Sequence, residues 1–306
     1  MNLRALRPAF PTAAERALAW RVVKLSARGF FKDNNASWAA AIAYYSLLSL
    51  FPLLLAIGSV AAFFVDPQWA VAQATHYLGT LLPRGSVAID RIVVQTLSAA
   101  RGAGLITLIP LLWTGSLVFG AVTKALNIVF AAEEDLRWKR RLFVRMAMLL
   151  TLGVMFLVAL ASPFVLQLLR WIFGILPIGQ ETLFQLIVHA LPPVFVLAAF
   201  FLAYRFVPQR QPQWRAALAG ALLAMLIFAT AKPIFLGYLH WLARYNVVYG
   251  SLAGIIVIVL WTWIVAMIGL FGAQVTAHAQ AVFIEGESME DVERRHLQRR
   301  SRPRDG

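Results

Sequence analysis

Long apolar runs separated by short blocks of charge constrain this chain more than any other feature. One helical crossing of a bilayer needs about 20 consecutive apolar residues, and about six segments reach that length. Because lipid offers the backbone no hydrogen bonds, such segments fold as helices. We therefore predict an all-α fold, a polytopic helical membrane bundle of about six transmembrane helices with short interfacial helices. The predicted spans are about 37–65, 103–130, 142–169, 183–204, 216–243 and 250–277.

The composition agrees with lipid as the main solvent. The chain is 60% apolar and 14% charged, whereas a soluble domain is about 45–50% apolar and about 25% charged. The absence of cysteine excludes disulfides and thiolate metal sites. The first long run begins at Ser37 and is too long for the apolar core of a signal peptide, so we expect it to remain as the first span.

Lys and Arg are distributed unequally between alternate connections. One side, which includes both termini, carries 21 of them, and the other side carries five. The positive-inside rule therefore places both termini in the cytoplasm. Headgroup contact also accounts for the net charge of +14 without a nucleic-acid partner. We divide the chain into a cytoplasmic N-terminal segment with an interfacial helix (1–36), a six-helix transmembrane domain (37–280) and a charged cytoplasmic tail (281–306).

Polar side chains inside a membrane are functional candidates by default. The predicted spans contain Lys124 and Lys232 but no Asp or Glu, which weakens the case for proton-coupled or sodium-coupled transport. Lys232 lies about 17 residues, or roughly 25 Å, along its helix from Arg215, too far to reach the cytoplasm. Either it extends to the outer headgroups, or it binds an anionic ligand such as a lipid phosphate. Lys124 is explained by snorkelling to the cytoplasmic surface.

Several uncharged residues also stand out in the predicted spans. Tyr45, Ser49 and Pro52 share one helical face, which indicates either hydrogen bonding between helices or the lining of a polar cavity. Four residues are structural candidates, for a helix kink or for close packing of helices: Pro52, Pro233, Gly250 and Gly254. The last two form a G-x-x-x-G pattern, which favours close helix packing and leaves a homo-oligomer open.

Signatures of catalysis are absent from the sequence. It contains no H-E-x-x-H, no G-x-S-x-G and no phosphate-binding glycine loop. We therefore expect no enzyme activity, no catalytic residue, no cofactor and no metal ion. Glu133, Glu134 and Asp135 are the only nuclease-like metal ligands to propose, and a solvated charged loop is the preferred interpretation.

Four stretches resemble the YihY/BrkB family of bacterial inner-membrane proteins, over about residues 30–280. They are AIAYYSLLSLFPLLLAI at 41–57, WTGSLVFGAVTKALNIVF at 113–130, YRFVPQRQPQWRAALAGALLA at 204–224 and VYGSLAGIIVIVLWTWIVAMIGLFGAQV at 248–275. The resemblance implies a six-span bundle in the inner membrane. Members have carried the label ribonuclease BN, while others are associated with serum resistance or proposed to move lipid or lipopolysaccharide precursors.

The resemblance also marks positions, although no catalytic role comes with them. By motif position, Tyr45, Ser49 and Pro52 fall in the first block, Asn127 in the second, Tyr204 and Pro208 in the third, and Tyr249 and Gly250 in the last. We take Lys232, Tyr45, Ser49 and Tyr249 as the candidate lipid-binding or substrate-binding residues.

Our leading hypothesis is a cell-envelope protein, transporter-like or flippase-like, that handles an anionic lipid or a lipid-linked substrate. Its expected partners are membrane lipids and not nucleic acid. The second hypothesis is a non-catalytic membrane scaffold in envelope biogenesis, and the third is a ribonuclease.

Overall fold

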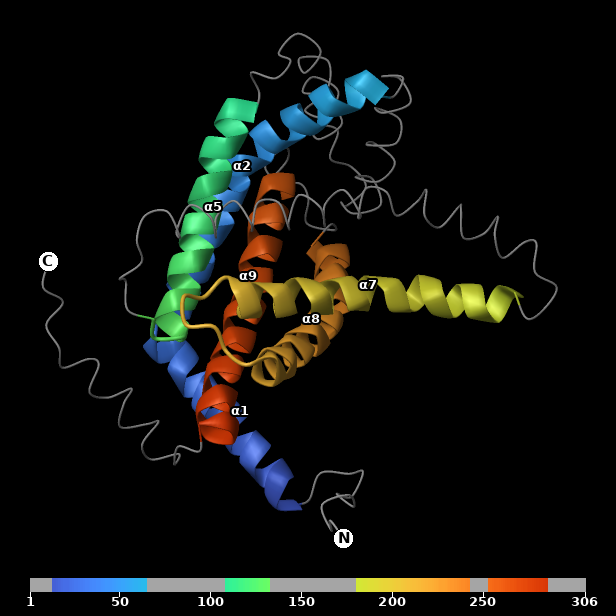
Figure 1. Cartoon of the computed structure of the whole chain (residues 1–306). Helices are drawn as coiled ribbons and strands as arrows, with labels where there is room; N and C mark the ends of the chain where they lie inside the picture. The colour runs from blue at the N-terminus through green and yellow to red at the C-terminus, as the bar shows by residue number, and fades with distance from the viewer. Residues whose placement is uncertain (1–12, 65–107, 133–179, 243–252, 286–306) are drawn as a thin grey trace, which may run out of the picture.

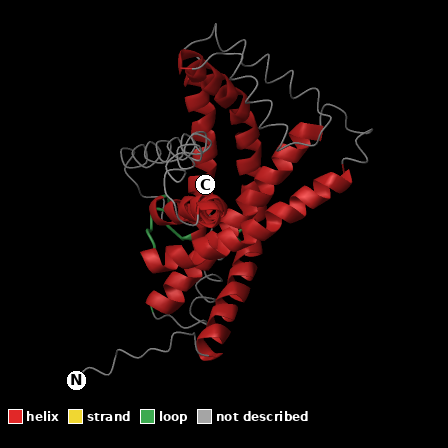
Figure 2. Ribbon diagram, turned by 90° about the vertical axis from the view of Figure 1, so that its right-hand side faces the viewer, coloured by secondary structure: helices red, strands yellow, loops and turns green. Residues whose placement is uncertain are grey.

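The computed structural model describes residues 13–64, 108–132, 180–242 and 253–285 (Figure 1). Within these ranges the chain is helical and no strand occurs (Figure 2), which confirms the predicted all-α class. The helices are α1 (Ala13–Lys32), α2 (Asn35–Phe64), α5 (Leu108–Val129), α7 (Gln180–Phe206), α8 (Trp214–Leu242) and α9 (Ala253–Ala279), which the π-helix η4 (Gln280–Ile284) continues. The predicted span at 142–169 lies outside the described residues, as do Glu133, Glu134, Asp135, Tyr249 and Gly250.

Two of the described helical segments are long and apolar enough to cross a membrane. They are Trp214–Leu239 in α8 and Gly254–Phe283 in α9 and η4, and α7 adds a shorter apolar segment, Pro192–Phe206. Within an apolar 18-residue stretch of each long segment, 22% is buried, whereas the core helix of a soluble protein is mostly buried. The apolar surface that remains is suited to lipid. The total of about six spans stays a prediction.

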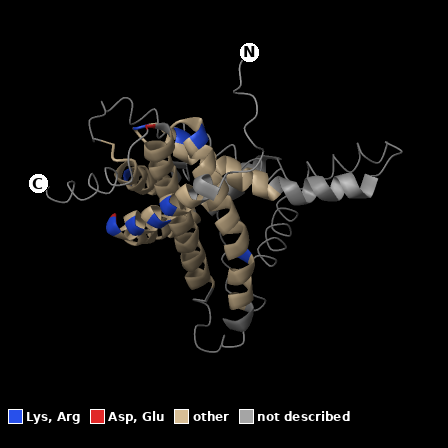
Figure 3. Ribbon diagram, turned by 90° about the horizontal axis from the view of Figure 1, so that it is seen from below, with Lys and Arg blue, Asp and Glu red and all other residues tan. Residues whose placement is uncertain are grey.

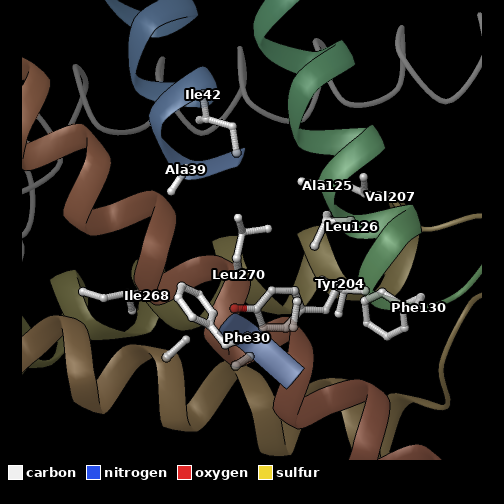
Figure 4. Close-up of a cluster of buried hydrophobic side chains, with 14 of the residues drawn as sticks. Phe30, Ala39, Ile42, Ala125, Leu126, Phe130, Tyr204, Val207, Ile268 and Leu270 are labelled. Carbon is white, nitrogen blue, oxygen red and sulfur yellow. The ribbon is translucent and has the colours of Figure 1, made fainter. Parts of the chain in front are cut away.

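Helix α9 lies at the centre of the described bundle and packs against α1, α2, α5, α7 and α8 (Figure 1). Its sequence is apolar on all sides, as expected of a helix surrounded by other helices and lipid. A buried cluster around it draws on every described helix (Figure 4). The members labelled there include Phe30, Ile42, Leu126, Tyr204 and Leu270.

A tight turn joins α1 to α2. Asn34 has a φ of 55°, a left-handed conformation that asparagine tolerates better than most residues. Its side-chain Oδ1 accepts a hydrogen bond from Ser37 Oγ at 2.9 Å, and Asp33 N donates to Gly29 O at 2.9 Å. This turn directs α1 along the C-terminal part of α9 and α2 along its N-terminal part.

The face of α1 that packs on α9 explains its imperfect amphipathicity. Val22, Ser26 and Phe30 recur at four-residue spacing and are all buried. The sequence predicts a helix here lying at the membrane interface. The helix itself is present as α1, and its position at an interface stays a prediction.

Candidate functional site

The contact between α8 and α9 has two halves, and the first is built from small residues. A Cβ atom on Gly220 would overlap the Gly272 backbone oxygen and Thr276 Oγ1. One on Gly272 would lie 2.8 Å from Ala224 Cβ. The two backbones therefore approach as closely as they can, as small residues permit in membrane helices.

The second half of the same contact is built from aromatic rings. Phe235 stacks on Trp261 with ring centroids 4.8 Å apart, and Phe228 lies 5.6 Å from the same ring. Gly254, on the N-terminal side of Trp261, is buried. Aromatic rings, and not close backbones, therefore fill this half of the contact.

Lys232 lies at the edge of this aromatic half. It is four residues after Phe228 and three before Phe235, so the three share one side of α8. Its side chain is exposed, and no described hydrogen bond or ion pair involves it. Beyond Arg215 it is the only Lys or Arg in α8. Figure 3 shows that the ribbons of the described helices are mostly tan, with few Lys or Arg residues.

The residues of α2 that the sequence singled out lie elsewhere. Tyr45 is half-buried against the core cluster and meets Tyr44 edge to face at 5.5 Å. Ser49 Oγ donates to Ser46 O, within its own helix, at 2.9 Å. No described hydrogen bond or ring contact joins these two residues to Lys232. The α2 and α8 helices continue through Pro52 and Pro233.

A buried polar junction between α1 and α9 was missed in the sequence. Gln274 Nε2 donates to Asp33 Oδ2 at 2.5 Å. His278 Nδ1 lies 2.8 Å from Gln274 O and 3.1 Å from Ser26 Oγ. Since a carbonyl can only accept, Nδ1 carries the proton. Asp33 lies outside the predicted spans, yet the fold brings its carboxylate against one of them.

The sequence held a weak signal for this junction. Gln274 and His278 are spaced i and i+4 at the end of the most apolar run, which places both on one face of α9. Both side chains are almost fully buried, and Gln274 Oε1 has no hydrogen-bond partner among the described residues. A Cβ on Gly29 would lie 3.0 Å from this oxygen, so glycine leaves room for the amide.

The connection between α7 and α8 is tied to its neighbours by hydrogen bonds. Gln209 N donates to Asn127 Oδ1 at 3.0 Å, and Gln213 N donates to Gln280 Oε1 at 2.9 Å. Tyr204 Oη donates to Gly269 O at 2.7 Å. These bonds join residues from the second, third and last sequence blocks, so the blocks meet in one place and fix the ends of the helices.

We call this end of the bundle the basic end. It comprises α1, the C-terminus of α7, the N-terminus of α8, and η4. Val22 of α1 packs in one cluster with Ala216 of α8 and with Val275 and Ala279 of α9. The Lys and Arg residues of the basic end with described side chains are Arg21, Lys24, Arg28, Lys32, Arg205, Arg210 and Arg215. In the described part of the chain, no three His, Asp or Glu side chains gather into a metal site.

Apolar helices long enough to cross a membrane, with unburied apolar surface, are typical of an integral membrane protein. The chain belongs to the family described as virulence factor BrkB, whose family model matches residues 26–296. This confirms the resemblance found in the sequence blocks.

Two of the curated relatives described here are named as membrane proteins, and a third is named as ribonuclease-like. The chain is 29% identical over 260 residues to a UPF0761 membrane protein of Rhodospirillum centenum, covering 84% of this chain and 56% of that protein. It is 29% identical over 262 residues to one of Cronobacter sakazakii, covering 85% and 88%. A ribonuclease-like protein of Bacillus subtilis, YfkH, is 28% identical over 263 residues, covering 80% and 90%. No solved structure matches the chain.

Proposed function

We propose that this chain is a multi-pass protein of the bacterial inner membrane that handles an anionic lipid or a lipid-linked substrate, as a transporter or flippase would. One observation carries the proposal. Lys232 is an exposed cation on a helix long and apolar enough to cross a membrane, at the edge of the aromatic half of the α8–α9 contact.

The depth of Lys232 supports this choice of ligand. It lies roughly 25 Å along α8 from Arg215, within a hydrocarbon layer about 30 Å thick. The Cα–Cβ bonds of a helix tilt toward its N-terminus, so the Lys232 side chain starts out toward the middle of α8. A cation in hydrocarbon costs about 3 kcal/mol on insertion scales. A lipid phosphate that reaches it would offset this cost.

The orientation of the protein is part of the same proposal. With the basic end in the cytoplasm by the positive-inside rule, Lys232 would face lipids of the outer half of the bilayer. The arginines of the basic end would attract anionic headgroups on the opposite side. Such a molecule would offer positively charged side chains to anionic headgroups on both sides of the bilayer.

Lipid identification by native mass spectrometry tests the role of Lys232. We expect purified wild-type protein to retain phosphatidylglycerol in preference to phosphatidylcholine. Lys232→Ala and Lys232→Glu should lose this retained lipid, while Lys232→Arg keeps it because the charge remains. Lys124→Ala is the matched control, since Lys124 is an exposed lysine that already stacks over the Trp38 ring at 5.6 Å.

Reconstitution separates lipid movement from the scaffold alternative. Proteoliposomes with a fluorescent phosphatidylglycerol should exchange it between leaflets faster than protein-free liposomes, and Lys232→Ala should lower that rate. Suppose instead that the bound lipids are nonspecific and the same in wild type and the Lys232 variants, and that no exchange between leaflets occurs. Lys232 would then be an interfacial anchor. The scaffold hypothesis would then be preferred.

A ribonuclease is the remaining alternative, because the Bacillus subtilis relative is named as ribonuclease-like. Incubation of purified protein with RNA, with and without Mg²⁺ or Mn²⁺, tests it directly. We expect no metal-dependent cleavage. Cleavage that Glu133→Ala abolishes would replace the lipid proposal with a nuclease.

A further inference from the structure

Each of the three apolar segments ends at the basic end in an exposed aromatic residue. The segments Pro192–Phe206, Trp214–Leu239 and Gly254–Phe283 have Phe206, Trp214 and Phe283 at their ends there, and these side chains are 51–57% exposed. Trp20 on α1 is 61% exposed. We call Trp20, Phe206, Trp214 and Phe283 the aromatic rim.

Contacts between their elements hold the rim residues together as one surface. Arg205 Nη1 donates to Pro212 O at 3.0 Å, across the connection that leads to Trp214. The bond from Gln213 N to Gln280 Oε1 ties the start of α8 to η4, which carries Phe283. Helix α1 joins this surface through Val22, which packs with Ala216 and Val282.

Three of the rim rings each lie next to a Lys or Arg side chain of the same helix. Lys24 Nζ lies 5.5 Å from the Trp20 ring, and the Arg215 guanidinium lies 5.4 Å from the Trp214 ring. Arg205 lies 6.0 Å from the Phe206 ring. Such stacking orients a cation and leaves its N–H groups available for an anion.

The positive charge of the rim is largely uncompensated. Neither Lys24 nor Arg215 has a described carboxylate partner. Of the acidic side chains described at this end, Glu285 is paired with Arg210 at 2.9 Å, and Asp33 accepts a hydrogen bond from Gln274 Nε2. The surface therefore combines exposed rings with cations that need anionic partners.

We propose that the aromatic rim is a binding surface for anionic phospholipid headgroups, with Lys24 and Arg215 contacting lipid phosphates. Tryptophan rings favour the boundary between headgroups and hydrocarbon, and Lys and Arg beside it attract anionic lipids. Arginine with aromatic rings also suits single-stranded nucleic acid. Here, however, an apolar helix begins directly at the rim, and lipid covers such a surface whereas nucleic acid does not.

The rim is separate from the Lys232 site proposed above, from which it lies roughly 25 Å away along α8. Titration of phosphatidylglycerol into full-length protein in phosphatidylcholine micelles, followed by the rise in melting temperature, measures headgroup binding. Lys24→Gln with Arg215→Gln should weaken this binding about 5-fold per charge, or roughly 25-fold in total. The effect should shrink in high salt.

Lys232→Gln is the comparison that keeps the two proposals apart. An effect of the rim pair with none from Lys232→Gln supports the rim and counts against the Lys232 site. An effect of Lys232→Gln alone overturns the rim and leaves the Lys232 proposal standing. Displacement of phosphatidylglycerol by RNA at equal charge concentration would also overturn the rim, since it would mark a nucleic-acid surface.

Labelling of single cysteines tests the depth of the rim independently, because the chain has no cysteine of its own. Gln211 precedes the rim residue Trp214, while Ala219 and Ala229 are exposed on α8 beyond it. In vesicles we expect Gln211→Cys to react readily with a water-soluble maleimide and Ala219→Cys and Ala229→Cys to be protected. Equal reactivity at all three positions would overturn the placement of the rim at a headgroup boundary.

Discussion

The two halves of the α8–α9 contact differ in what separates the helices. At the basic end, Gly220 and Gly272 bring the backbones together, and polar bonds tie the helices to α1 and α7. At the other half, the rings of Phe235 and Trp261 stack between the two helices. The same pair of helices thus meets backbone to backbone at one end and ring to ring at the other.

This difference matters because helices in lipid have little hydrophobic force to hold them together. Packing and hydrogen bonds supply the stability instead, and both are concentrated at the basic end. The aromatic half contributes ring contacts but no described hydrogen bond between α8 and α9. Lys232 lies beside the half that lacks the close backbone contact.

The largest expected effect comes from placing a methyl group in the tight half. Gly220→Ala should destabilise the protein by about 3 kcal/mol, near the upper end for overpacking, because one obstacle is the Gly272 backbone oxygen. Gly237→Ala is the matched control on the same helix, since a Cβ there meets nothing within 4 Å. It should be neutral or stabilise by up to about 1 kcal/mol through helix propensity.

Unfolding by sodium dodecyl sulfate in mixed micelles, followed by tryptophan fluorescence, gives both free energies. Equal effects of the two substitutions would show that α8 and α9 are not in close contact at Gly220. The proposed difference between the two halves of the α8–α9 contact would then be wrong.

An intermediate effect is expected in the aromatic half. Phe235→Ala should destabilise by about 1–2 kcal/mol, less than the 3–5 kcal/mol typical of a soluble core, because the unfolded ring stays in lipid and only packing is lost. The same unfolding assay measures it. Ile234→Ala, an exposed neighbour on α8, is the control and should change stability little. A loss as large as in a soluble core would show that this half is as tightly built as the other.

A smaller effect tests the hydrogen bond that joins α7 to α9. Tyr204→Phe removes the donor to Gly269 O and should cost about 1 kcal/mol. Tyr44→Phe serves as the control, because Tyr44 is exposed and its hydroxyl has no described hydrogen bond. If both substitutions cost the same, the Tyr204 bond contributes nothing to the rigidity of the basic end.

Much of the fold could be predicted from the sequence because lipid imposes a single solution on long apolar runs. The runs around α8 and α9 show this most clearly, since Arg215 and the residues after Ala279 mark their ends. Helix α1 was predicted as well, but its partner was not. Its buried face packs on α9, which is far away in the sequence. Ser26 and His278, which lie in contact, are 252 residues apart.

The candidate site was harder to predict, because isolated residues do not reveal their neighbours. Lys232 stands out by charge alone, and its position beside Phe228 and Phe235 follows from helical spacing. Asp33 did not stand out, because it lies in a charged segment outside the spans. Only the Asn34 turn, with its positive φ, directs the Asp33 carboxylate to Gln274.

The smallest effect concerns the ion pair between Arg210 and Glu285, which closes the basic end at its surface. Their atoms lie 2.9 Å apart, but the Arg210 side chain is 50% exposed, so water and salt screen the attraction. A double-mutant cycle of Arg210→Ala and Glu285→Ala should give a coupling energy of about 0.5 kcal/mol that falls as salt is added. A coupling above about 2 kcal/mol, unchanged by salt, would mean that this pair is desolvated by lipid or by residues around it. The rigidity of the basic end would then depend on charge pairing more than on the glycine contact.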